Sequence, residues 1–104
     1  MGSEMCIRDS NTMAIWRSVL ALAHMKGGNV DAALNEASLA VQADHRTHLS
    51  RITLAAVRLM QEDTTQAAKA MRDAMRVTPD LTEDQMAAVV GRKLAQGLAA
   101  LDLS

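Results

Sequence analysis

The segment DHRTH, residues 44 to 48, holds the residue types of this chain that are best suited to bind a metal ion. Asp44, His45 and His48 offer one carboxylate and two imidazoles. A zinc site closes a tetrahedron of well-defined ligands, and no second histidine or acidic pair accompanies this segment. We therefore interpret DHRTH as a solvated linker between two helical units, and we expect no bound metal.

The remaining candidates for chemistry have structural explanations. The single cysteine, Cys6, allows neither an internal disulfide nor a zinc site built on thiolates. The carboxylate pairs Glu62-Asp63 and Glu83-Asp84 lie at predicted helix starts, where capping explains them. No serine lies in a recognisable nucleophile motif, and the sequence has no glycine-rich phosphate loop. We therefore expect a protein that is not an enzyme and that uses no cofactor.

Three basic residues lie close together at residues 69–76. Lys69, Arg72 and Arg76 are spaced i, i+3 and i+7, so they share one face of a predicted helix, with Asp73 nearby. We interpret this strip as a solvated outer face. A contact for an acidic partner and a small helical nucleic-acid binder are the alternatives. The formal net charge of −1 does not indicate a nucleic-acid partner, and none is expected.

The composition indicates helices. Of the 104 residues, 49% are hydrophobic, mostly Ala, Leu, Val and Met, with one Trp and no Phe or Tyr. This mixture favours helix over strand, so we predict an all-α protein. The apolar run at residues 19–23 is far too short to cross a bilayer and lacks the layout of a signal peptide. We expect no membrane partner and a cytoplasmic location.

Residues 1–11 are set apart from the rest of the chain. MGSEMCIRDSN resembles a string that recurs at the ends of proteins predicted from environmental sequencing, where a translated library adapter is its source. We predict a disordered or artefactual tail there. The functional interpretation therefore begins at residue 12.

A period of 34 residues runs through the middle of the chain. The identities at this offset are Arg17 and Arg51, Leu20 and Leu54, Ala21 and Ala55, Ala33 and Ala67, and Ala40 and Ala74. Apolar spacing divides each period into two helices, at about 12–26 and 30–43, then at about 49–60 and 64–78. We predict two antiparallel helical hairpins, residues 12–45 and 46–80, which together form the segment 12–80.

Turn chemistry supports these boundaries. In GGN, residues 27–29, the glycines end the first helix and Asn29 is a candidate cap for the second. DTTQ, residues 63–66, is a capping box that opens the fourth helix, and Pro79 ends it.

These features resemble the tetratricopeptide repeat over roughly residues 14–80. The residues that carry the likeness are Leu20-Ala21, Leu54-Ala55, Gly28, Asp44 and Pro79, with the alanines at 33, 40, 67 and 74. The chain departs from the family where aromatic residues usually wedge the helices. His24 and Arg58 stand in one such place, where a packed histidine is expected, and Ala37 and Met71 in another. Glu62 replaces the turn glycine in the second unit.

Residues 81–104 differ from both units. TEDQ, residues 82–85, is a further capping box, and the apolar residues that follow form one stripe: Met86, Val90, Leu94, Leu98 and Leu101. We predict a C-terminal capping helix, weakened by Gly91 and Gly97, that shields the last hairpin. The PDLT segment and the GLxxL tail also resemble the C-terminal repeat region of bacterial cyclase-type and winged-helix signalling regulators. That likeness implies an alternative role as a regulatory or oligomerisation segment.

The resemblance to the repeat family implies a concave groove lined by one face of each first helix. In this chain the groove residues are Ile15, Leu22, Met25, Leu49, Ile52, Leu59 and Met60. An aliphatic groove with flexible methionines suits an amphipathic helix or an apolar peptide. We expect a non-catalytic interaction scaffold whose partner is a protein or peptide, a second copy of itself (a homodimer), or other domains of the parent chain.

Two alternatives concern what covers this groove. Neighbouring repeats or the chain's own C-terminal helix would close it without any partner. Two hairpins are also fewer than the three or more repeats that such folds usually need for independent stability. We therefore expect a marginally stable unit, or one completed by upstream repeats or by a second copy.

Overall fold

The structure is a computed structural model that describes residues 10–44 and 46–101. Within these ranges the chain forms six α-helices and no strand, which confirms the predicted all-α class. The helices are α2 (Ser10–Lys26), α3 (Val30–Ala43), α4 (His48–Met60), α5 (Thr64–Val77), α6 (Glu83–Val90) and α7 (Arg92–Ala99). The predicted tail at residues 1–11 lies outside the described residues except for its last two, which belong to the first turn of α2.

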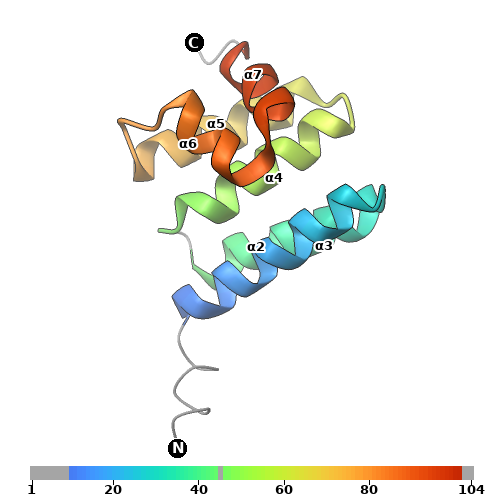
Figure 1. The fold of residues 1–104 in the computed structure, drawn as a ribbon. Helices are drawn as coiled ribbons and strands as arrows, with labels where there is room; N and C mark the ends of the chain where they lie inside the picture. The colour runs from blue at the N-terminus through green and yellow to red at the C-terminus, as the bar shows by residue number, and fades with distance from the viewer. Residues whose placement is uncertain (1–9, 45, 102–104) are drawn as a thin grey trace, which may run out of the picture.

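The helices follow one another as three successive pairs (Figure 1). α2 packs against α3, α4 against α5, and α6 against α7. We name them the first hairpin, the second hairpin and the C-terminal pair. α4 also contacts both helices of the first hairpin, and α6 and α7 both contact α4. Each pair therefore packs on the pair before it.

The turns of the two hairpins have the same hydrogen-bonding pattern, 34 residues apart. The amide of Gly28 donates to the carbonyl three residues earlier (3.1 Å), and that of Asn29 to the carbonyl five residues earlier (2.8 Å). Glu62 and Asp63 make the same two bonds, at 2.9 and 3.0 Å. This is the Schellman motif, which requires a left-handed residue after the helix. Gly28 has φ of 81° and Glu62 has φ of 62°, so a glutamate occupies a position that favours glycine.

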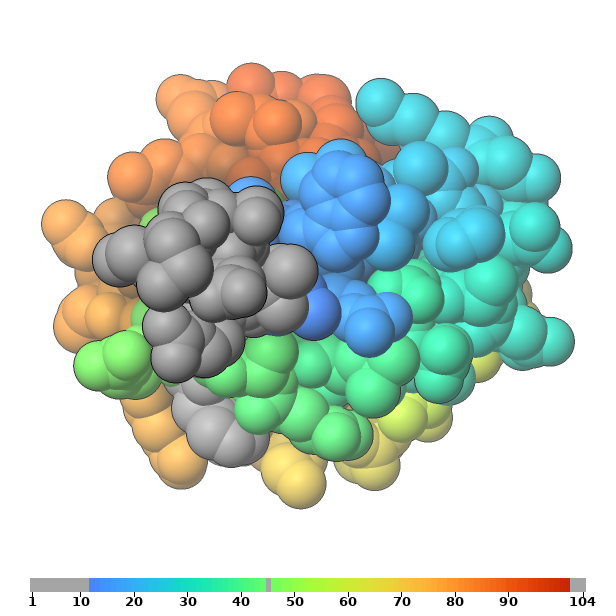
Figure 2. All heavy atoms as spheres, turned by 90° about the horizontal axis from the view of Figure 1, so that it is seen from below, coloured from blue at the N-terminus to red at the C-terminus, as the bar shows by residue number. Residues whose placement is uncertain are grey.

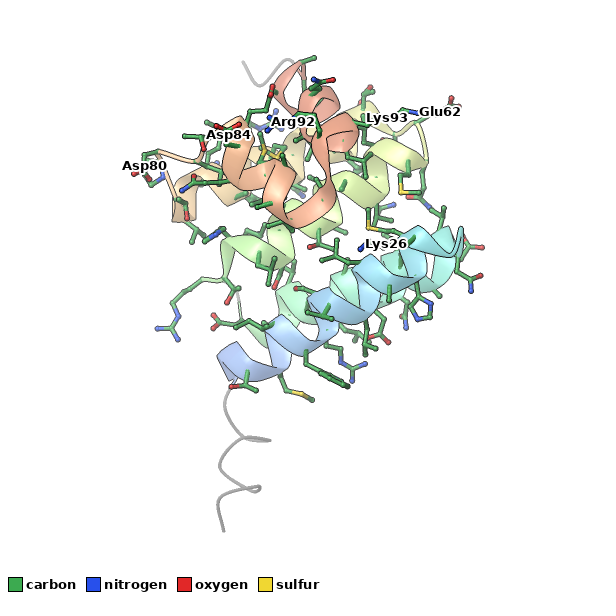
Figure 3. The ribbon with its side chains drawn as sticks, in the orientation of Figure 1. Lys26, Glu62, Asp80, Asp84, Arg92 and Lys93 are labelled. Carbon is green, nitrogen blue, oxygen red and sulfur yellow. The ribbon has the colours of Figure 1, made fainter. Side chains whose placement is uncertain are left out.

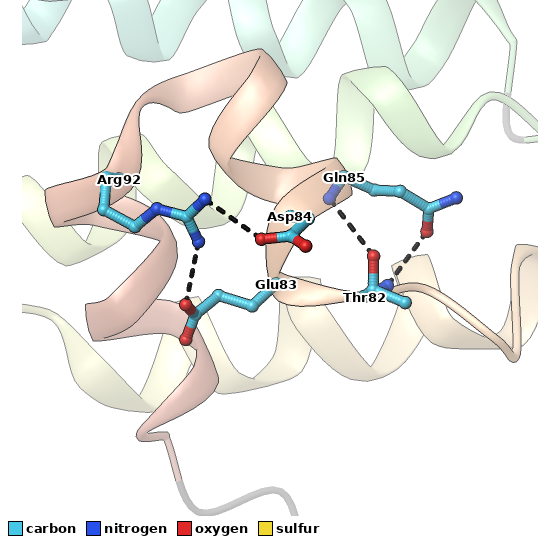
Figure 4. Close-up of polar contacts among 5 residues, drawn as sticks. All are labelled: Thr82, Glu83, Asp84, Gln85 and Arg92. Atoms are coloured by element: carbon cyan, nitrogen blue, oxygen red, sulfur yellow. Dashed lines mark hydrogen bonds and ion pairs between the residues drawn. The ribbon is translucent and has the colours of Figure 1, made fainter.

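Of the three predicted caps, the box at Thr82 forms completely, the box at Asp63 forms only its side-chain cap because the Asp63 amide donates to the Arg58 carbonyl instead, and the cap at Asn29 does not form. Asp63 accepts a hydrogen bond from the amide of Gln66 at 3.2 Å. Thr82 and Gln85 form both bonds of a capping box, at 3.2 and 2.9 Å (Figure 4). Asn29 makes no side-chain cap bond, contrary to expectation, although its φ and ψ of −88° and 72° nearly match those of Asp63, −93° and 78°. The backbone therefore does not explain why Asp63 forms a cap bond and Asn29 does not, and the two residues differ in their side chains.

Small side chains at recurring positions let the helices approach closely. Of the described alanines that have no exposed surface, six form three pairs at the 34-residue offset: Ala21 and Ala55, Ala33 and Ala67, and Ala40 and Ala74. Between the hairpins, the buried hydroxyls of Ser18 and Ser50 are hydrogen-bonded at 3.2 Å. Close packing therefore rests on the absence of bulk at these positions.

An arginine at the same position of each hairpin ties its two helices together. Arg17 on α2 pairs with Glu36 on α3, with 3.1 Å between Nη1 and Oε2. Arg51 on α4 pairs with Asp73 on α5, with 3.5 Å between Nη1 and Oδ2. All four side chains are partly buried, which reduces the screening of these ion pairs by solvent.

The C-terminal segment forms two short helices where the sequence predicted one. Gly91 separates them, with φ of 93° and ψ of 158°, a conformation that non-glycine residues rarely adopt. Arg92 at the start of α7 reaches back to α6 and binds Asp84 (3.0 Å) and Glu83 (2.9 Å), as Figure 4 shows. Hydrogen bonds to Asp84 and then Glu83 raise the pKa of the Arg92 guanidinium above its usual value.

The C-terminal pair contacts the second hairpin closely. Met86, Ala95 and Leu98 are buried in the shared core. Gly97 lies so near α4 that a Cβ atom there would be only 2.7 Å from Cδ2 of Leu59. The pair therefore packs on the face of α4 that the sequence assigned to the groove.

Candidate interaction surface

The predicted groove residues separate into buried and accessible groups. Ile52 is fully buried and Met25 is 8% exposed, so neither side chain is free to contact a partner in this conformation. Leu59 is partly buried beneath α7. This differs from the sequence prediction because α4 packs on α2, and the C-terminal pair packs on α4.

Three of the predicted groove residues lie beside the C-terminal pair. Only a small apolar hollow of about 110 Å³ remains there. Its lining comprises Leu22, Met25, Lys26, Met60, Val89, Val90 and Leu94. Figure 3 shows Lys26 at the end of α2, between the first hairpin and the helices above it. Residues of the C-terminal pair therefore lie beside three of the residues that were predicted to line the groove, Leu22, Met25 and Met60.

Two other predicted groove residues line a separate, open hollow, which we call the open end of the predicted groove. Ile15 from α2 and Leu49 from α4 line a hollow of about 660 Å³, together with the polar residues Asp44, Arg46, Thr47 and His48. Ile15 is 40% exposed and Leu49 is half-buried. Of the seven predicted groove residues, these two lie together at an accessible, partly apolar surface.

Asp44 and Arg46 are hydrogen-bonded to each other at the rim of this hollow. The amide of Arg46 donates to Oδ1 of Asp44 at 2.9 Å, and Nε of Arg46 lies 3.4 Å from the same oxygen. The backbone hydrogen bond is the main reason that the pKa of the Asp44 carboxyl is below its usual value. The Arg46 side chain is 87% exposed, so the rim presents a cation to solvent beside Ile15 and Leu49.

The candidate metal ligands are only partly described. Asp44 and His48 line the same hollow, whereas His45 lies outside the described residues. Within residues 10–44 and 46–101, no three His, Cys, Asp or Glu side chains are grouped so as to hold a metal ion. Asp44 is engaged by Arg46 as a local structural contact.

The basic strip lies on the outside of α5. Lys69, Arg72 and Arg76 are all exposed. Arg76 is 3.5 Å from Asp73, which also pairs with Arg51. A carboxylate between the basic side chains offsets part of the charge that an acidic partner would meet.

α2 also carries an exposed apolar surface that was not predicted from the sequence. Trp16 is 59% exposed, Val19 is 50% exposed and Ala23 is exposed. We call these three residues the outer face of α2. Seen from below, α2 (blue) lies at the molecular surface (Figure 2). The sequence could have predicted this face, because the apolar residues 16, 19 and 23 follow helical spacing.

The fold and the surface define an all-helical protein with successively stacked hairpins and accessible apolar patches on its first helices. Comparison with protein-family models, with curated proteins and with solved structures gives no match. In the described ranges, no helix combines the length and the apolar character needed to traverse a lipid bilayer.

Proposed function

We propose that the chain is a non-catalytic protein-interaction module built from tetratricopeptide-like helical hairpins. Support comes from the two Schellman turns at the 34-residue offset and from Arg17 and Arg51, which share that offset and each pair with an acidic residue on the second helix of their hairpin. A repeat of one hairpin design places its first helices side by side, as α2 and α4 are placed here. Such an array offers a surface for another polypeptide.

The open hollow at Ile15 and Leu49 carries the proposal. It joins an apolar floor to a rim with an exposed guanidinium, from Arg46, and an imidazole, from His48. Peptide sites commonly combine apolar contacts with a few polar groups that fix orientation. The partner that fits is an apolar or helical peptide segment with an acidic residue beside it.

The closed end of the groove limits the size of this partner. α6 and α7 pack over α4, and only about 110 Å³ remains at Leu22 and Met60. A bound segment therefore contacts the open end and stops where the C-terminal pair begins. A longer helix along the whole groove would have to displace that pair from Leu59 and Gly97.

A peptide-display selection against the full chain tests the proposal. We expect enrichment of peptides that have apolar residues next to Asp or Glu. Ile15→Asp and Leu49→Asp should each weaken the enriched peptides at least tenfold, about 1.4 kcal/mol, because a carboxylate replaces an apolar contact and repels the peptide's acid. Val77→Asp is the matched control, since Val77 is an exposed apolar residue on α5 and does not line the hollow.

Two results would contradict this function. One is a selection that enriches no sequence pattern. The other is a set of peptides that bind the Ile15 and Leu49 variants as tightly as the unchanged chain while circular dichroism shows both variants folded. In that case the open hollow is not the binding surface.

A further inference from the structure

A second hollow, on the second hairpin, is lined by more basic than acidic side chains. Its charged lining residues are Arg51 and Arg58 of α4, and Lys69 and Asp73 of α5. It shares no lining residue with the open hollow at Ile15 and Leu49. Its volume is about 160 Å³, which admits a group of a few heavy atoms, since one water molecule takes about 30 Å³ in the liquid. The hollow is therefore large enough for one small anionic group.

The positive charge of this hollow is concentrated at one end. At the other end Arg51 is paired with Asp73, with 3.5 Å between Nη1 and Oδ2. Arg58 lies seven residues after Arg51 on α4, about 10 Å further along the helix axis. Gln66 precedes Asp73 by seven residues on the antiparallel helix α5, so it lies at the end of Arg58, and Lys69 follows one turn later.

No carboxylate of the described residues is paired with Arg58 or Lys69. Arg58 donates to the side-chain oxygen of Gln61 at 3.3 Å, and Lys69 is exposed and makes no ion pair there. Two acidic residues follow α4. Asp63 accepts the amide of Gln66 as the cap of α5, and Glu62 lies at the tip of the turn (Figure 3). Two positive charges therefore remain available to a ligand.

The first hairpin has no such cluster at the equivalent positions. At the 34-residue offset Arg58 corresponds to His24, and Lys69 corresponds to Asn35. The arginine ion pair that joins the two helices is present in both hairpins. The first hairpin thus closes without these two cations, so packing of the helices does not account for Arg58 and Lys69.

Two cations and an amide match the charge and the acceptors of a phosphate monoester. Such a group carries a charge of about −1.5 to −2 at pH 7 and three strong acceptor oxygens. The guanidinium of Arg58 can donate to two oxygens at once, the ammonium of Lys69 adds a point charge, and the amide of Gln66 donates from its nitrogen. A carboxylate has one charge and two oxygens, so it satisfies this set less well.

We propose that Arg58, Lys69 and Gln66 bind the phosphoryl group of a phosphate monoester in the hollow of the second hairpin. Val41 and Leu54 also line this hollow, and they offer apolar contact to the organic part of the ligand. The phosphoryl group can come from a phosphorylated side chain or from a small organic phosphate. This site goes beyond the proposed peptide hollow and does not depend on it.

An NMR titration of the full chain with three probes tests the charge and the apolar contact. The probes are phenyl phosphate, inorganic phosphate and benzoate. Phenyl phosphate should bind at least tenfold more tightly than benzoate, which has the same ring and a single charge. It should also bind more tightly than inorganic phosphate, which has no apolar part. The amide signals of residues 58, 66 and 69 should shift most.

Single substitutions test the residues. Arg58→Gln and Lys69→Met should each weaken phenyl phosphate at least tenfold, because each removes one charge-assisted donor. Lys93→Met is the matched control, since Lys93 is an exposed lysine on α7 that does not line the hollow. This control removes the same net charge and should leave binding unchanged. Arg58→Lys keeps the charge but loses the paired donors, so its loss should be intermediate.

A phosphothreonine peptide with a flanking leucine, compared with phenyl phosphate, distinguishes the two sources of the phosphoryl group. Tighter binding of this peptide assigns the group to a partner chain, and weaker binding assigns it to a small molecule. Either result supports the site, provided that the unphosphorylated peptide does not bind there.

Three results would overturn the proposal. One is the absence of signal shifts at millimolar phenyl phosphate. Another is equal binding of benzoate and phenyl phosphate. The third is binding that Arg58→Gln and Lys69→Met leave unchanged while circular dichroism shows both variants folded. Loss of peptide binding in the Ile15 and Leu49 variants is a separate readout, so failure of one proposal leaves the other standing.

Discussion

Single substitutions in the two equivalent turns should move the stability of the protein in opposite directions. Gly28 and Glu62 occupy the same position of two Schellman motifs, with φ of 81° and 62°. Glycine adopts this conformation without steric cost, whereas residues with a Cβ atom do not. Glu62→Gly is therefore expected to raise the free energy of unfolding, and Gly28→Ala is expected to lower it.

The magnitude follows from two opposing contributions. A left-handed conformation costs a non-glycine residue about 1–2 kcal/mol, and the extra backbone entropy of glycine in the unfolded chain costs about 0.5–1 kcal/mol. The net change is about 0.5–1 kcal/mol for each variant. Glu62 is exposed, and no hydrogen bond or ion pair joins its side chain to the described residues. A Cβ at Gly28 would meet no atom within 4 Å, so only the backbone contributes there.

Urea denaturation followed by circular dichroism measures both changes, at a concentration where sedimentation shows a single species. A change of 1 kcal/mol corresponds to a shift of about 4–8 °C in Tm for a domain of this size. Gly27→Ala is the matched control, because Gly27 lacks a positive φ and a Cβ there would make ordinary contacts of 3.6 and 3.7 Å. We expect this control to be neutral or stabilising.

The reasoning is refuted if Gly28→Ala is tolerated as well as Gly27→Ala. It is also refuted if Glu62→Gly destabilises the protein without loss of helix content. Either result would mean that the glutamate makes a favourable contribution at the turn, or that the turn relaxes when its central residue changes.

Three other changes test the core, the C-terminal pair and the linker. Ile52→Ala should lower the free energy of unfolding by about 2–5 kcal/mol, because the side chain is fully buried. A loss below about 0.5 kcal/mol in urea denaturation would show that the Ile52 side chain is not buried. Gly97→Ala places a Cβ atom 2.7 Å from the end of the Leu59 side chain, and displacement of that side chain should offset the gain of about 1 kcal/mol in helix propensity within α7. In a Leu59→Ala background the same change should therefore stabilise the protein by about 1 kcal/mol, and an equal effect in both backgrounds would show that the contact is not the cause. Asp44 has a lowered pKa because Arg46 donates to its carboxylate. The contribution of Asp44 to stability is therefore present above the unfolded pKa of about 3.9 and is lost as the pH falls through the folded pKa. Asp44→Asn should remove this part of the pH dependence when stability is followed in an acid titration. A pH profile identical to that of the unchanged chain would contradict this prediction.

The local part of the fold could be predicted from the sequence because its causes are local. Apolar spacing and the GGN and DTTQ segments placed α3 at residues 30–43 and the start of α5 at residue 64, as the structure has them. The small residues at the 34-residue offset are buried as the close approach of helices requires. A capping box is complete within four residues, so its formation at Thr82 needed no knowledge of the rest of the chain.

The sequence indicated a single weakened helix in the C-terminal segment, where the structure has two. The stripe from Met86 to Leu101 has helical spacing throughout, and Gly91 alone indicates only a weaker helix. The structure uses that glycine at φ of 93° to separate α6 from α7. Tertiary contacts stabilise this break, because it lets both short helices contact α4.

Which apolar side chains are buried was decided by the tertiary structure alone. The apolar residues 15, 16, 19 and 22, like the apolar residues 49, 52 and 59, follow helical spacing. This spacing does not indicate which neighbouring layer covers each of them. Ile52 is buried in the core where α4 packs on the first hairpin and beneath the C-terminal pair, and Trp16 is exposed because no described layer precedes α2. The sequence by itself therefore determined the helices and their repeat. Only the stacking of one pair on the next decided which face is core and which face is free to meet a partner.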